Sequence, residues 1–100
     1  MKYIGFFDEM KLYNNNGPVS DFLVEKINYD KDRVCQYLEN QKVVAICAKY
    51  AIDCVSKEII NSGFKVLTDD EYTWPDFLIY HIENYNISLL YQTTFDKDCP

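Results

Sequence analysis

A chain of 100 residues, 48% of them hydrophobic and 26% charged, has room for one folded domain, and these values are not those of a disordered chain. The formal net charge of −6 argues against a basic face for nucleic acid or for an anionic membrane surface. If the acidity serves recognition as well as solubility, the partner it favours is a basic protein.

The first half of the chain predicts a strand followed by two helices. Residues 2–7 are mainly aromatic and aliphatic, which is typical of a strand, and the Asn-Asn-Asn-Gly-Pro run at 14–18 predicts a surface loop. Apolar residues at helical spacing predict a short helix over about 19–27. A second helix is expected from the N-cap Asp30 to about residue 41.

The second half predicts several strands and a closing helix. The apolar run 43–48 has the length of a central buried strand, and 51–55 has weaker strand character. Ile59 and Ile60 fit either a short strand or a helical turn. Two strands joined by an acidic turn predict a hairpin over 64–74.

Pro75 then opens a predicted buried helix over 76–85. Residues 89–95 are expected to form a last turn or short helix on the sheet, and 96–100 to be frayed. The whole chain, residues 1–100, is therefore predicted to be a single α+β domain, with a small, mostly antiparallel sheet and helices packed on it.

The N-terminus and the cysteines point to a cytoplasmic protein. Two acids at positions 8 and 9 stand where a signal peptide would continue apolar, and no apolar run approaches the roughly 20 residues of a membrane span. The four cysteines are expected to be reduced thiols, and three lie in apolar surroundings typical of a core. These three are Cys35, Cys47 and Cys54; the fourth, Cys99, lies near the end of the sequence.

The residues offer little for catalysis or for a cofactor. His81 is the only histidine and lies within a predicted helix, where a partly buried structural role is favoured over catalysis. With three glycines in all, the chain has no phosphate-binding loop, and no serine stands in a nucleophile motif. We therefore expect no enzyme and no cofactor; a cysteine-dependent enzyme is the weakest alternative.

Acidic residues beside aromatic ones form the candidate contact surface. Acids beside aromatic residues are common in protein interfaces, and some of the nine tyrosines of the chain are expected to lie at the surface. The competing interpretation is a hairpin tip that is merely solvated. A cation site is disfavoured because the Asp-x-Asp-x-Asp-Gly pattern is absent. The candidates are Asp69, Asp70, Glu71, Tyr72 and Asp76, with Asp30 and Asp32 as a second patch.

Several segments resemble a group of small bacterial proteins: Met1–Glu9, Tyr29–Asp30 with the stretch Tyr37–Ala45, and above all Leu67–Asp76 followed by Leu78–Ile87. Those proteins are commonly encoded beside polymorphic toxins of the contact-dependent growth-inhibition and Rhs kinds, and look like their immunity proteins. This chain departs from them at three places: Asp70 stands for Gly, His81 for Tyr, and Leu90-Tyr91 for Leu-Pro.

The resemblance implies a protein that binds and neutralises the C-terminal domain of a cognate toxin, a basic nuclease, in the cytosol. Trp74 would then be part of the scaffold, where it could anchor the C-terminal helix to the sheet. The alternative is a generic acidic interaction or regulatory domain without a toxin partner, since a shared fold does not fix a function.

Overall fold

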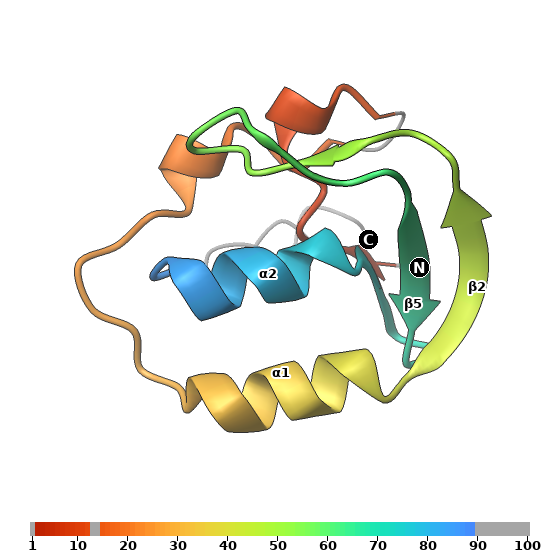
Figure 1. Ribbon diagram of the computed structural model, residues 1–100. Coiled ribbons are helices and arrows are strands. Elements are labelled where there is room, and N and C mark those ends of the chain that lie inside the picture. Colours follow the sequence, from red (N-terminus) through yellow and green to blue (C-terminus); the bar gives the residue numbers. More distant parts are fainter. Residues whose placement is uncertain (1, 13–14, 90–100) are drawn as a thin grey trace.

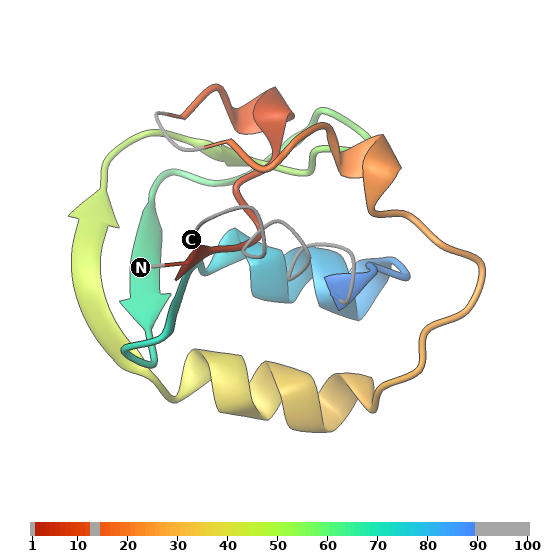
Figure 2. The same cartoon turned by 180° about the vertical axis from the view of Figure 1, so that it is seen from behind.

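Two helices lie side by side against a four-stranded sheet in the computed structural model, which describes residues 2–12 and 15–89 (Figures 1 and 2). The strands are β1 (Lys2–Tyr3), β2 (Lys42–Cys47), β3 (Ala51–Ile52), β4 (Ile59–Asn61), β5 (Phe64–Thr68) and β6 (Tyr72–Pro75). The helices are α1 (Lys31–Glu39) and α2 (Phe77–Asn84), with 3-10 turns at Asp8–Met10 and Val19–Asp21.

The sheet has the order β1-β6-β5-β2 and is antiparallel except where β1 runs parallel to β6. A separate antiparallel pair is formed by β3 and β4, which confirms the strand interpretation of Ile59 and Ile60. The predicted hairpin is β5–β6, and the predicted closing helix is α2. This architecture confirms the α+β class with a mostly antiparallel sheet.

The apolar strand β2 does not lie where the sequence placed it. It is an edge strand, and Val43, Val44 and Ile46 are 45%, 51% and 78% exposed, so the prediction of a central buried strand is wrong. A continuous apolar run shows no face preference, and its place in the sheet depends on which strands pair elsewhere. A register shift between Val43 and Ala45 marks a bulge, a common feature of edge strands.

The predicted first strand ends early, at Tyr3. Gly5 has φ +78°, and a Cβ atom there would come within 2.8 Å of the Leu78 side chain, so the chain turns close against α2. Only a residue without a side chain fits this backbone and this contact.

The predicted helix over 19–27 is also absent beyond the 3-10 turn. The segment instead runs beside residues 86–88: Leu23 forms a bridge with Ile87, Val24 N–H donates to Asn86 O, and Ser88 N–H donates to Phe22 O. Backbone pairing with a distant segment has overridden a weak local helix pattern.

Helix α1 begins as predicted and ends two residues early. Asp30 Oδ1 accepts from the N–H groups of Asp32 and Arg33, at 3.0 and 3.3 Å, which is an N-cap. At the other end, side chains satisfy three successive carbonyls of the last turn. Asn40 Nδ2 donates to Gln36 O, Gln41 Nε2 donates to Tyr37 O, and Trp74 Nε1 donates to Leu38 O.

The core lies between the sheet, α2 and the N-terminal segments. Its largest fully buried side chains include Trp74, Phe7, Phe22 and Phe77. Among the cysteines, Cys35 and Cys54 are buried as predicted and Cys47 is half-buried; these three are free thiols. Cys99, the element expected over 89–95 from residue 90 on, and the segment 96–100 lie outside the described residues. No helix in 2–12 and 15–89 has the length and apolar content to cross a membrane.

Candidate functional site

The acidic turn between β5 and β6 is held by Asp69. Its Oδ1 accepts from the N–H groups of Glu71 at 3.0 Å and Tyr72 at 2.7 Å, and its Oδ2 accepts from the Tyr37 hydroxyl at 2.5 Å. Burial alone would raise the pKa of Asp69, but the hydrogen bonds, that from Tyr37 foremost, hold it below its ordinary value. Asp69 therefore builds the turn and ties it to α1.

The other two acids of the turn are paired with lysines. Asp70 lies 3.2 Å from Lys42 Nζ, and Glu71 lies 3.7 Å from Lys2 Nζ, which also lies over the Tyr72 ring. The side chains of Asp70 and Glu71 are 78% and 67% exposed and within reach of a partner, but two cations offset much of the charge of the turn.

Asp70 has φ +75°, a conformation that favours glycine. We expect Asp70→Gly to be more stable than Asp70→Ala by about 1 kcal/mol, because both variants lose the Lys42 pair and only alanine keeps a strained Cβ. Urea unfolding of the two variants measures this difference. Equal midpoints would mean that the turn carries no backbone strain at this position.

The remaining predicted contact residues lie apart from this turn. Asp76 follows the far end of β6, where its Oδ2 accepts from Lys65 N–H at 3.1 Å and burial raises its pKa. Asp30 and Asp32 lie at the start of α1, whereas Tyr37 near its end contacts the turn (Figure 1). The structure thus divides the seven predicted residues among three places, and it does not bring them into one patch.

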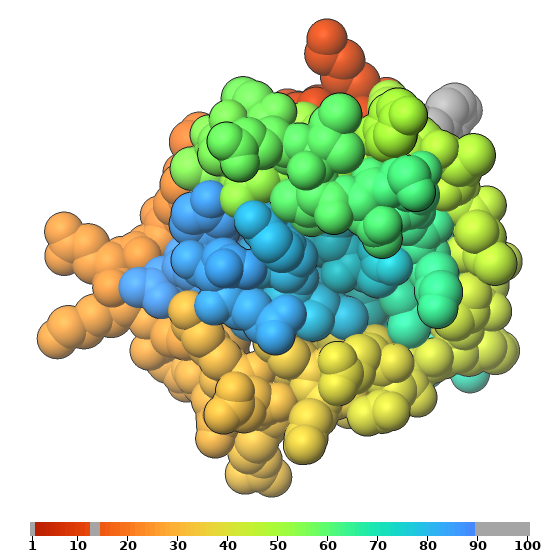
Figure 3. All heavy atoms as spheres, in the orientation of Figure 1, coloured from red at the N-terminus to blue at the C-terminus, as the bar shows by residue number. Residues whose placement is uncertain are grey.

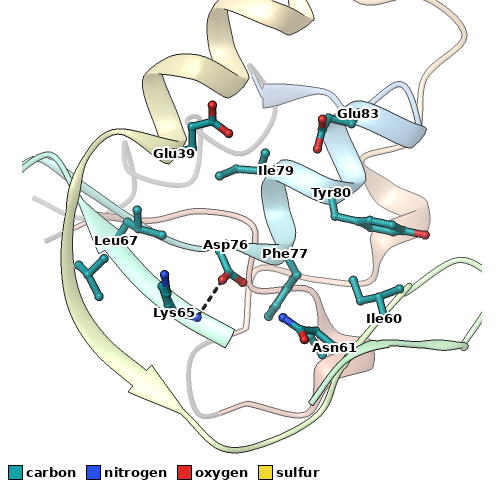
Figure 4. Close-up of a pocket in the computed structure, with 12 residues that line it drawn as sticks. Glu39, Ile60, Asn61, Lys65, Leu67, Asp76, Phe77, Ile79, Tyr80 and Glu83 are labelled. Carbon is teal, nitrogen blue, oxygen red and sulfur yellow. Dashed lines mark hydrogen bonds between the residues drawn. The ribbon is translucent and has the colours of Figure 1, made fainter. Parts of the chain in front are cut away.

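A groove of about 370 Å³ opens between α1, α2, β4 and β5 (Figure 4). It lies on the face shown in Figure 3, where yellow α1, blue α2 and the green segment of β4 and β5 meet. Six of the twelve lining side chains are apolar, and four of these six are buried; three acids and one lysine supply the charge. The lining residues are Glu39, Val43, Ala51, Ile60, Asn61, Lys65, Leu67, Asp76, Phe77, Ile79, Tyr80 and Glu83.

Two of these acids, Glu39 and Glu83, lie on either side of Ile79 in the close-up (Figure 4). Both are exposed, and neither forms an ion pair with any residue that the structure describes. Burial raises the pKa of the Cys35 thiol between the helices, and the negative charges of Glu83 and Glu39 raise it further. The two carboxylates therefore act on one region. Neither is among the contact residues predicted from the sequence, because only the packing of α1 against α2 brings them to the same groove.

A buried polar cluster beside the groove is fully hydrogen-bonded. Asp53, 3% exposed, accepts at Oδ2 from the hydroxyls of Tyr80 and Tyr85, both at 2.7 Å, and at Oδ1 from the N–H groups of Val55 and Ser56. Burial alone would raise the pKa of Asp53, but these hydrogen bonds outweigh it and lower the pKa below its ordinary value. The cluster fixes the turn between β3 and β4 against α2.

His81 has a structural role, as predicted, and its burial is complete. Its Nε2 lies 2.9 Å from Cys54 N–H and accepts that hydrogen bond, so Nδ1 carries the proton and donates to Phe77 O at 2.6 Å. Burial lowers the pKa of His81 and favours the neutral ring. Both ring nitrogens are therefore hydrogen-bonded to the backbone.

Within the described ranges, no group of three or more His, Cys, Asp or Glu residues is placed to hold a metal ion. Comparison with protein families, with curated proteins and with solved structures finds no match to this chain.

Proposed function

We propose that this protein is an immunity protein: it binds the C-terminal domain of a toxin, a basic nuclease, in the cytosol and blocks its activity. One observation carries the proposal: the groove combines a partly apolar wall with two carboxylates, Glu39 and Glu83, that form no ion pair with any residue in 2–12 and 15–89. Apolar surface next to desolvated charge is the usual composition of an energetically dominant contact.

The charge of the whole chain supports the same kind of partner. A net charge of −6 would accelerate association with a basic protein. Because salt screens this attraction, the binding should weaken as the salt concentration is raised. Tyr37, 51% exposed and bound to Asp69, offers an aromatic contact on α1, the helix that also carries Glu39. An inhibitory complex of ordinary size would bury roughly 1,200–2,000 Å², which is more than the groove alone.

The resemblance to immunity proteins adds support from particular segments. Its strongest part, Leu67–Asp76 with Leu78–Ile87, forms the end of β5, β6 and α2. These elements supply a wall of the groove and Glu83, so the segments that resemble the family also build the proposed contact.

The test is co-production with the C-terminal domain encoded by the gene immediately upstream. We expect cells that make this domain to grow when the protein is present, and an inactivated form of the domain to co-purify with it. Growth arrest despite the protein, together with no complex, would contradict an immunity function. A complex without rescue would favour a regulatory interaction domain.

A further inference from the structure

The apolar wall of the groove suits the aliphatic part of a long side chain. Val43 on β2 and Leu67 on β5 are register partners, and Ile79 on α2 lines the same groove as both. Val43 is 45% exposed, so part of this wall faces water in the free protein. Long cationic side chains place their methylene groups on such surfaces and keep the charged end in contact with water or a carboxylate.

The charges in the groove are not balanced. The backbone N–H of Lys65 donates a hydrogen bond to Asp76 Oδ2, and the charge of Lys65 lowers the pKa of Asp76 against the larger effect of burial. With Asp76 offset by Lys65, Glu39 and Glu83 remain as the uncompensated charges. The groove therefore favours a cation.

The positions of these two acids oppose helix stability. Glu39 is the last residue of α1 and Glu83 lies in the last turn of α2, where the helix dipole disfavours a negative charge. Neither carboxylate recovers this cost through an ion pair to the described residues. In natural proteins, such violations of a local rule are expected at functional or strained sites.

We propose that the groove is the binding site for an arginine side chain of the bound toxin domain, with its methylene groups on Val43, Leu67 and Ile79 and its guanidinium group beside Glu39 or Glu83. This inference rests on the proposed function and names the chemistry of the contact. Arginine fits better than lysine because its planar head is more weakly hydrated and loses less on entering a partly apolar groove.

The direct test is a titration of the ¹⁵N-labelled protein with N-acetyl-L-argininamide, followed by NMR. We expect saturable shifts at groove residues, with a dissociation constant in the millimolar range. N-acetyl-L-citrullinamide keeps the stem without the charge, and guanidinium chloride keeps the charge without the stem, so both should bind more weakly. N-acetyl-L-lysinamide should also bind more weakly. Shifts that are absent, lie outside the groove, or match those of the citrulline compound would overturn the proposal.

A charge-matched pair of variants isolates the two carboxylates. Glu39→Gln/Glu83→Gln removes both groove acids, and Asp21→Asn/Glu25→Gln removes two exposed acids from a segment that does not line the groove. We expect the first to weaken argininamide binding about fivefold, as the loss of one exposed ion pair at the upper end of the usual range would. The second should leave the binding unchanged.

The urea midpoint of Glu39→Gln/Glu83→Gln should equal or exceed that of the wild type, which separates lost binding from lost folding. Equal weakening by both double variants would overturn the assignment to the groove. This titration needs no toxin. If the groove does not bind argininamide but the protein still protects cells, only the arginine site is rejected. If the groove binds argininamide but the protein does not protect cells, only the immunity function is rejected.

Discussion

Replacing Trp74 with alanine is expected to lower the free energy of unfolding by about 3–5 kcal/mol, much of the stability of a small domain. The ring is 1% exposed, it is the largest fully buried side chain, and its Nε1 donates to Leu38 O at 3.3 Å. The sequence predicts that Trp74 anchors the C-terminal helix to the sheet; the structure shows in addition a hydrogen bond from Trp74 to α1. Alanine would remove both the packing and this link between α1 and the sheet.

Trp74→Phe is the matched control. It keeps an aromatic ring in the core but leaves Leu38 O without its side-chain donor, so a loss of about 1–2 kcal/mol is expected. Because Trp74 is the only tryptophan, unfolding must be followed by far-ultraviolet circular dichroism in urea. A loss below 1 kcal/mol for Trp74→Ala would show that α1 is held to the sheet by other contacts.

Replacing Asp53 with alanine is expected to cost on the order of 3 kcal/mol, because four partly exposed donors would lose a buried, charged acceptor. The donors are the hydroxyls of Tyr80 and Tyr85 and the N–H groups of Val55 and Ser56. Asp53→Asn should cost less, since its amide oxygen can still accept from the backbone and the tyrosine hydroxyls can rotate to accept from its amide nitrogen.

Asp53→Asn also gives a defined pH dependence. The pKa of Asp53 is lower in the folded than in the unfolded protein, so its contribution is complete above about pH 3.9, the unfolded value, and shrinks as pH falls towards the folded value. The stability difference between wild type and Asp53→Asn should therefore be constant from pH 7 to 5 and smaller at pH 3. A difference that grows on acidification would contradict the assigned direction, and Glu25→Gln provides the exposed control.

Local chemistry predicted the elements whose signals are complete within a few residues. Asp30 starts α1 through its own side chain, and the alternation of 64–68 with the acidic turn specifies the β5–β6 hairpin. Asp70 adopts the left-handed geometry that the turn requires. The closing helix follows from the apolar stripe after Pro75.

Features that depend on pairing between distant segments could not be predicted from the sequence. The strand β2 is an edge because β6 takes the other side of β5, and residues 22–24 do not continue a helix because residues 86–88 pair with them. The candidate site failed to emerge for the same reason. Glu39 and Glu83 are ordinary helix residues in the sequence, and they share a groove only after α1 packs on α2.

The measurement that tests the groove most directly is protection of cells that make the upstream toxin domain, compared among three proteins at equal abundance. The wild type and Asp21→Asn/Glu25→Gln should protect and should co-purify with the inactivated domain. Glu39→Gln/Glu83→Gln should fold with undiminished stability and yet protect less and bind more weakly. Equal protection by all three proteins would contradict recognition through the groove.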